Sequence, residues 1–291
     1  LYEPAAFLAA FLNSQPMGFY RPAQLVQDAR RHGVEVRAVD VRFSDWESTL
    51  ERAANDEPAV RLGLHQIKGL GQAGAERLVA ARLRSTFRDV EDLARRAHLH
   101  RKDLEALAAA GALAGLSGHR HRARWVVAGV EQPLPLLENA TTHEAEPLLR
   151  RPSESEDIVA DYASLGLTLR RHPLALLRPE LSKQRYLSAG AIRALNHGDA
   201  VRTAGLVICR QHPTSASGVI FMTLEDETGQ TNLIVWPTVV ERQRREVLHA
   251  GLLAVAGQVQ KEGEVLHVIA RRLVDKTGLL GGIEIESRDF R

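Results

Sequence analysis

The chain of 291 residues is 44% hydrophobic and 25% charged, which leaves room for about two or three globular domains with sizeable cores. Its formal net charge of +2 is too small to favour nucleic acid by itself, so binding to a polyanion would depend on local patches. The single cysteine, Cys209, excludes an internal disulfide and a cysteine-based zinc site, and no run is long and apolar enough to span a bilayer. We expect a cytoplasmic protein with no membrane partner.

Residues 1–56 are predicted to be mostly helical. The opening LYEPAAFLAAFLNSQ is typical of an amphipathic helix whose apolar face holds Phe7, Leu8, Phe11 and Leu12. A second helix is expected at residues 23–32, ended by Gly33, and the alternation over residues 34–41 predicts a short strand or an extended connection. Because the chain starts inside a helix at Leu1 and not at a methionine, we expect it to be part of a longer protein.

Residues 57–118 carry the most informative pattern, LGLHQIKGLGQAGAERLVAAR. An apolar helical segment is expected to run into residues 67–71, and a second helix to follow at residues 73–81. Two glycines permit a tight turn between them, and the start of the second helix offers free N–H groups to an anion. This is the helix-hairpin-helix pattern, which binds duplex DNA through backbone phosphates without reading its sequence; an ordinary helical hairpin is the alternative. The predicted duplex contacts are Lys68, Gly69, Leu70, Gly71, Gln72 and Arg77.

A second helical pair is predicted at residues 90–97 and 102–110, with Gly111 as its C-terminal stop. It lacks the Gly-x-Gly turn, so we expect it to be a structural partner that buries the apolar face of the first pair. Residues 119–198 are predicted to hold a linker and connecting helices. Within them, residues 131–155 are rich in Pro, Glu and Thr, and Ser153 and Glu156 offer a capping box to a following helix.

Residues 199–291 change character. Five β-rich runs, at residues 200–210, 218–226, 230–236, 252–260 and 265–273, are separated by turn signals, and a helical stretch follows the third run. This layout predicts a five-stranded OB-fold barrel with a C-terminal tail. The usual nucleic-acid cleft of that fold lies across strands two and three, here between the loop 211–218 and the turn at residues 262–263.

The alternation of strands two and three indicates which side chains of the barrel face outward. Met222 and Leu224 are expected in the core, whereas Phe221 and Trp236 face outward as candidate platforms for stacked bases. Trp236 could instead pack beneath the helix that follows it. The predicted single-strand contacts are Arg202, Arg210, Gln211, His212, Phe221, Trp236, Lys261 and Arg271.

No catalytic residue and no metal ligand is predicted. The twelve histidines include the pairs His98/His100 and His119/His121, but no carboxylate pattern of known ligand sets accompanies them. No nucleophile has a base at a suitable spacing, and Asp226 is interpreted as a turn residue. We therefore expect these residues to need no cofactor of their own.

The order of motifs resembles the C-terminal part of bacterial C-family DNA polymerases, in particular their error-prone, damage-inducible branch. The resemblance covers AAFLAAFLNSQPMGFYRPAQLVQDARRHGVEV, GLHQIKGLGQAGAERLVAAR, LGLTLRRHPLALLR, VRTAGLVICRQ, FMTLEDETGQTNLIVW and the terminal SRDF. It implies an α+β multidomain fold: the end of a fingers domain (1–56), a helix-hairpin-helix domain (57–118), connecting helices (119–198) and an OB-fold domain (199–291). It also implies translesion synthesis during the SOS response by a parent enzyme whose Mg²⁺-binding palm is absent here, so this part alone should be inactive.

The resemblance also bears on partners. Replicative members carry a sliding-clamp motif between the hairpin and OB domains, and residues 134–152 have no such motif. This departure fits recruitment through an inactive, Y-family-like accessory protein, alongside duplex and single-stranded DNA. Two alternatives remain: a stand-alone repair scaffold or ligase-like DNA-binding module, and an OB domain used for protein docking only.

Overall fold

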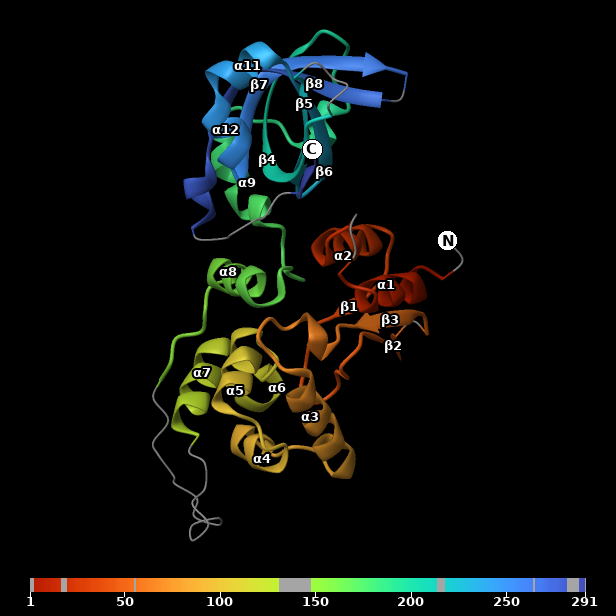
Figure 1. The fold of residues 1–291 in the computed structure, drawn as a ribbon, viewed down its shortest axis with the longest axis vertical. Helices are drawn as coiled ribbons and strands as arrows, with labels where there is room; N and C mark the ends of the chain where they lie inside the picture. Colours follow the sequence, from red (N-terminus) through yellow and green to blue (C-terminus); the bar gives the residue numbers. More distant parts are fainter. Residues whose placement is uncertain are drawn as a thin grey trace. The chain divides into compact units, whose positions relative to one another are not determined.

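The computed structural model describes residues 3–16, 20–54, 56–130, 148–213, 218–263, 265–281 and 288–290 (Figure 1). The chain divides into two compact units, Leu1–Leu169 and Arg170–Arg291, and each has its own buried hydrophobic cluster. The predicted assignment of four functional segments is a finer division than this one and stays a prediction. Most of the predicted linker, and residues 214–217 of the predicted cleft loop, lie outside the described residues.

The first unit begins with α1 (Pro4–Asn13) and α2 (Pro22–Arg31), followed by a three-stranded sheet in the order β1 (Val36–Arg37), β3 (Pro58–Arg61), β2 (Thr49–Arg52). Only the first of these strands was predicted. The predicted apolar face of α1 is wrong in part: Leu8 and Leu12 are buried, but Phe7 is 42% exposed and stacks on Phe11. Ala5 and Ala9 are buried instead of the phenyl rings of Phe7 and Phe11, because their small side chains let α1 pack closely against its neighbours.

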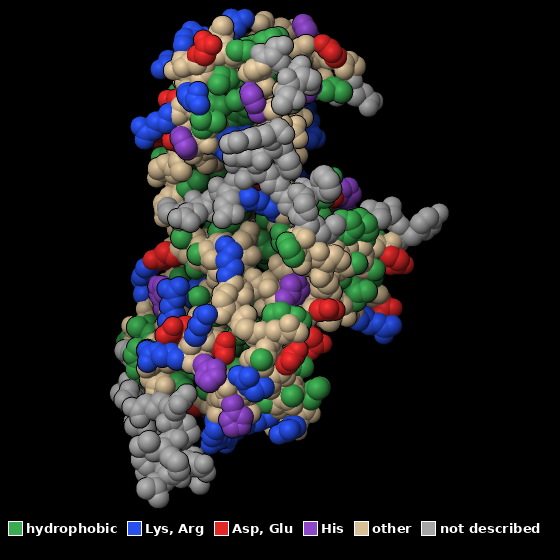
Figure 2. Space-filling model, viewed as in Figure 1, with side chains coloured by type: hydrophobic (Ala, Val, Ile, Leu, Met, Phe, Trp, Pro, Cys, Tyr) green, Lys and Arg blue, Asp and Glu red, His purple; other side chains and the backbone are tan. Residues whose placement is uncertain are grey.

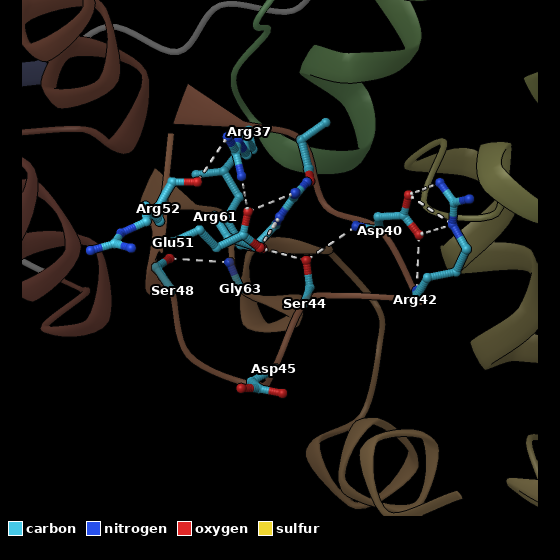
Figure 3. A network of polar contacts seen from close by, with 12 residues as sticks. Arg37, Asp40, Arg42, Ser44, Asp45, Ser48, Glu51, Arg52, Arg61 and Gly63 are labelled. Carbon is cyan, nitrogen blue, oxygen red and sulfur yellow. Dashed lines mark hydrogen bonds and ion pairs between the residues drawn. The ribbon is translucent and has the colours of Figure 1, made fainter. Parts of the chain in front are cut away.

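One carboxylate, that of Glu51 on β2, connects all three strands of this sheet (Figure 3). It accepts hydrogen bonds from Arg61 on β3 at 2.8 Å and from Arg37 on β1 at 2.6 Å. The hydrogen bond from Arg61 lowers the pKa of Glu51 below its usual value of 4.5; partial burial works against this change, and Arg37 supports it. Glu51 therefore stabilises the sheet in its charged form.

Replacing Glu51 with glutamine should remove a stabilisation that depends on pH. Since the pKa of Glu51 is lower in the folded state, its contribution is present above about pH 4.5 and is lost as the pH falls through the folded value. We expect Glu51→Gln to cost roughly 1 kcal/mol at neutral pH and less at about pH 3.5. Urea unfolding at both pH values measures this, with the exposed Glu47→Gln as control. An equal cost at both pH values would contradict the assignment.

The rest of the first unit is helical. It contains η1 (Leu64–Gln66), α3 (Gln72–Arg84), α4 (Val90–Arg96), α5 (Arg101–Ala109), α6 (Ala114–Ser117), α7 (Arg120–Gly129) and α8 (Glu154–Leu165). The helices predicted at residues 73–81, 90–97 and 102–110 are confirmed. The prediction of a helix before the glycine turn is wrong, because the chain there forms β3 and a single turn of 3-10 helix. A short apolar run suits a buried strand as well as a helix, and here Val60, Leu62 and Leu64 are all buried.

A buried ion cluster attaches α8 to the helical bundle. The guanidinium of Arg120, at the start of α7, donates hydrogen bonds to Asp157 and, at 2.5 Å, to Asp161, both on α8. Thr168 donates to the second oxygen of Asp161 at 2.7 Å. Gly111, with φ +74°, leaves room for the guanidinium, because a Cβ there would lie 3.1 Å from its nitrogen. Helices predicted only as connections thus pack against α4 and α5.

The second unit is built on a closed barrel (Figure 1). Its elements are α9 (Pro173–Lys183), α10 (Ala189–Ile192), β4 (Ala200–Gln211), β5 (Ile220–Asp226), β6 (Gly229–Val235), α11 (Pro237–Arg242), α12 (Arg244–His249), β7 (Leu252–Glu262), β8 (Val265–Asp275), η3 (Thr277–Leu280) and β9 (Arg288–Phe290). The strand order β5-β6-β8-β7-β4 closes through a β4–β5 pairing, and only β6–β8 is parallel within this ring. The predicted OB-fold barrel is confirmed, and its helical stretch is divided into α11 and α12.

The barrel core follows the predicted alternation, with Met222, Leu224 and Leu233 buried inside it. Asp226 ends β5 and organises the turn that follows. One of its oxygens accepts the N–H groups of Thr228 and Gly229, and the other accepts the N–H of Ala189. These contacts are those of a turn residue.

Candidate nucleic-acid interface

The turn between η1 and α3 requires glycine at one position. Gly69 has φ +86°, a conformation that favours glycine, and a Cβ at this position would have no atom within 4 Å. Gly71 is the N-cap of α3 with φ −79°, which any residue can adopt. The expectation that both glycines make the turn is therefore corrected: only Gly69 requires glycine. Leu70 is 8% exposed and anchors the turn in the core, whereas Lys68 and Gln72 are exposed.

The start of α3 lies close to a carboxylate that sequence reasoning missed. Asp103 of α5, which is 8% exposed, accepts the N–H of Gly71 at 3.4 Å. Gly74 permits this approach, because a Cβ there would lie 2.9 Å from the other oxygen of Asp103. Among the described residues, the N–H groups of Gln72 and Ala73 have no acceptor, as expected in the first turn of a helix. The exposed side of this helix start is open to an anion, while Asp103 holds the N–H of Gly71 from the buried side.

Two of the predicted contacts also hold the turn in place. The N–H of Lys68 donates to the carbonyl of Ser164 at 2.8 Å, and its amine lies 3.4 Å from the carbonyl of Tyr162, both near the end of α8. Arg77 of α3 is half-buried and donates to the carbonyls of Ala97 and His98 at 3.1 and 3.0 Å. Arg77 thus connects the two helical hairpins instead of pointing freely into solvent.

The second hairpin repeats the turn of the first, which the sequence analysis did not anticipate. His98 has φ +46°, Leu99 is 5% exposed, and His100 is the N-cap of α5 with φ −76°. These three residues correspond to Gly69, Leu70 and Gly71. The second pair lacks the Gly-x-Gly sequence, as stated, but its chain also turns through a positive φ directly before a helix. A usable signal was the leucine between two identical residues, Gly-Leu-Gly and His-Leu-His, each directly before a helix.

The outer face of the barrel carries an apolar row across β5, β6 and β8. Phe221 is paired in register with Ile234, which is paired with Ile269, and all three are half-buried. Trp236 is 50% exposed at the N-cap of α11, so the alternative that it packs beneath the helix is wrong. Both aromatic side chains are available to stack on a base, and contact with a base stays a prediction.

Arg210 does not suit its predicted contact with DNA. It is 8% exposed, and its guanidinium donates to the carbonyls of Val247 and Ala250 at 2.7 and 2.6 Å, which holds the end of α12. Lys261 is half-buried, and its amine donates to the carbonyl of Arg193 at 2.9 Å. Arg210 is therefore a structural residue of the barrel. The remaining predicted polar contacts, Gln211, His212, Arg202 and Arg271, are exposed.

Charge is distributed unequally between the two units. Residues 170–291 contain 17 Lys and Arg against 13 Asp and Glu, whereas residues 1–169 contain 21 against 23. Figure 2 shows the positive side chains interspersed with acidic and apolar ones on the visible face. The first unit thus has a net charge of −2, and the second unit, which holds the barrel, has a net charge of +4.

Neither a metal site nor a membrane span emerges from the described ranges. They contain no cluster of three or more His, Cys, Asp or Glu side chains that could hold a metal ion. None of their helices is long and apolar enough to cross a membrane.

Comparisons with known proteins agree with this architecture. Residues 33–123 match the helix-hairpin-helix motif family, and residues 201–275 match the family of OB-fold nucleic acid binding domains. The error-prone DNA polymerases of Alkalilimnicola ehrlichii, Methylococcus capsulatus and Azoarcus sp. are 57%, 53% and 54% identical over 99–100% of this chain. The chain spans only 28–29% of the length of these three relatives. Over essentially its whole length, the chain is thus similar to a segment of error-prone DNA polymerases that joins a helix-hairpin-helix region to an OB-fold domain.

Proposed function

We propose that the chain is the C-terminal, DNA-binding region of an error-prone DNA polymerase that copies damaged templates during the SOS response. The helical hairpins grip duplex DNA through its phosphates, and the barrel contacts the single-stranded template. The polymerase relatives support the parent activity, and the match to a nucleic-acid-binding OB family supports the role of the barrel. The observation that carries the duplex grip is that residues 69–71 and 98–100 both consist of a residue with positive φ, a buried leucine and the N-cap of a helix.

The physical basis for the duplex grip is the shared geometry of the two helix starts. Each presents N–H groups and the positive end of a helix dipole, and each has a cation nearby, Lys68 in one case and Lys102 in the other. Such contacts hold the backbone and carry no sequence information. Two equivalent turns suit a duplex, since its two strands present equivalent phosphates.

Other parts of the proposal concern the parent protein. Mg²⁺ would serve a palm domain elsewhere in that protein, because the described residues offer no carboxylate cluster for it. An accessory protein resembling Y-family polymerases is proposed as a partner, and the single cysteine supports a cytoplasmic location. Residues 134–147, where a clamp motif was sought in the sequence, lie outside the described residues.

A stand-alone repair scaffold would use the same two modules, and the near-complete match to polymerase segments favours the polymerase reading. A barrel used only for protein docking would not need its outward apolar row to lie beside arginines.

The duplex grip predicts that a negative charge at either turn weakens DNA binding without unfolding the protein. Gln72→Glu and Lys102→Glu place a carboxylate in the first turn of α3 and of α5, where it favours the helix dipole but repels phosphate. We expect each change to lower duplex affinity roughly five- to tenfold, and the two together to act about multiplicatively. Fluorescence anisotropy with two duplexes of unrelated sequence measures this and should give equal losses for both.

The control is Ser155→Glu, which adds one negative charge to the first turn of α8 in the same unit, as Gln72→Glu does in α3; Lys102→Glu removes a positive charge as well. It should leave duplex affinity unchanged. If Gln72→Glu and Lys102→Glu bind duplex as tightly as this control does, the hairpin turns do not hold the phosphates.

A further inference from the structure

A groove of about 480 Å³ lies on the outer wall of the barrel, on β4, β7 and β8. Three exposed arginines surround it: Arg185, before α10, Arg202 on β4 and Arg271 on β8. Its lining also includes Ala200 and Ala256, whose small side chains leave space for a ligand to approach the strands, and Gly257. Two of the three arginines were predicted to contact single-stranded DNA, but their place in one groove with Arg185 was not anticipated.

The arginines of this groove are held in position by neighbouring groups. The guanidinium of Arg202 lies 4.8 Å from the centre of the Tyr186 ring, within the range of a cation–π contact. Arg271 donates to the side-chain oxygen of Gln258 at 2.8 Å, and the amide of Gln258 donates to the carbonyl of Gly198 at 2.8 Å. Positioned donors lose less conformational entropy when they bind a ligand.

No carboxylate neutralises these side chains. Across the described residues, no Asp or Glu oxygen lies within 4.0 Å of the guanidiniums of Arg185, Arg202 or Arg271. Arg178 in the same unit differs: burial opposes its charge, but Glu227 and Asp226 raise the pKa of Arg178 above its usual value. Arg185 also has φ +58°, an uncommon conformation for a residue with a side chain. Among the described residues, the groove thus gathers positive charge that no carboxylate balances, and an anion would complement it.

Strand register connects the groove with the apolar row of the barrel. Phe221 pairs with Ile234, Ile234 with Ile269, Ile269 with Gln258, and Gln258 with Ala200 in the groove. Four steps between neighbouring strands, at about 4.8 Å each, span roughly 19 Å along the curved wall. One continuous surface therefore leads from an aromatic side chain to the arginines.

We propose that this groove binds phosphates of the same single strand whose bases lie on the row of Phe221, Ile234 and Ile269. An apolar row continued by guanidiniums matches a chain that carries both bases and phosphates. An acidic polypeptide would use the guanidiniums but has no bases to place on the row. The inference rests on the proposed single-strand binding by the barrel, and extends it to the wall formed by β7 and the start of β4.

The test uses the 291-residue chain and its Arg202→Gln/Arg271→Gln variant. Labelled oligo(dT) of 6 and 15 nucleotides is titrated by anisotropy between about 50 and 200 mM salt. For the longer strand, we expect the salt slope to fall by about 1.4, because each single-strand phosphate contact contributes about 0.7. The shorter strand is also long enough to reach from the row to the groove, so its salt slope should fall as well. Arg202→Lys/Arg271→Lys should restore most of the slope, and thermal unfolding by circular dichroism checks the fold.

The control removes two exposed arginines from the same unit, Arg242→Gln/Arg245→Gln on α11 and α12, and should keep the wild-type slope. If Phe221→Ala weakens binding of both strands while the groove variant keeps its slope, the groove is overturned and single-strand binding by the barrel stands. If the wild-type chain binds neither strand, both proposals are overturned. A groove variant that loses affinity for poly-glutamate but not for oligo(dT) would assign the groove to an acidic polypeptide.

Discussion

Replacing Arg120 with methionine should destabilise the Leu1–Leu169 unit by about 3–5 kcal/mol. The side chain of Arg120 is 6% exposed, and those of Asp157 and Asp161 are 10% and 11% exposed. Without the guanidinium, Asp157 and Asp161 would stay largely buried and would lose the hydrogen bonds that Arg120 donates to them. The cost arises mainly from leaving these buried acceptors without that cation, and less from the loss of the attraction itself.

Urea unfolding followed by circular dichroism measures this effect, with Arg124→Met, an exposed change on the same helix, as the control. Adding Asp157→Asn and Asp161→Asn to Arg120→Met should recover a large part of the loss, because the buried charges are then removed together. A loss no larger than that of Arg124→Met would mean that the cluster is not buried in solution.

Replacing Gly257 with alanine should destabilise the barrel by at least the 1–3 kcal/mol typical of an overfilled core, since backbone atoms must move. A Cβ at this position would lie well inside van der Waals contact with the carbonyl oxygen of Ile269 on β8. The β7–β8 register shifts between Ala256 and Gly257, so this close approach lies at an irregularity of the strand pair.

Gly278→Ala is the matched control, because a Cβ there has no atom within 4 Å and its φ lies outside the region that favours glycine. Thermal unfolding should show a lower Tm for the barrel with Gly257→Ala and no change with Gly278→Ala. Equal melting of the two variants would show that β7 and β8 are not as close as described.

The first hairpin turn could be predicted because a glycine indicates a position where the backbone can be left-handed. The second turn also passes through a positive φ, but at His98 there is no glycine to indicate it, since a non-glycine residue adopts positive φ only where its surroundings require it. Asp103 was missed for a similar reason. Its contact with Gly71 joins two helices that are distant in sequence, and no local pattern reports that pairing.

The barrel was predictable from the alternation of apolar and polar residues along its strands, but the burial of Arg210 was not. The register of β4 shifts between Val207 and Cys209, so side chains beyond this bulge change sides. Arg210 then lies beneath α12, although an uninterrupted alternation would place it outside. The small sheet of the first unit was missed because β2 and β3 have four residues each, too few for a clear period.

The position of α8 determines how much of the chain must be transferred together for the first hairpin turn to keep its support. Lys68 in the first turn is held by the end of α8, and α8 is held by Arg120 of α7. Neither α8 nor its acidic side chains lie within the residues that match the motif family. A graft of the motif alone into another protein would therefore carry the glycine turn without the helix that supports it. The transferable unit extends to Leu169, and recombination between genes would preserve the supported turn by exchanging that longer segment.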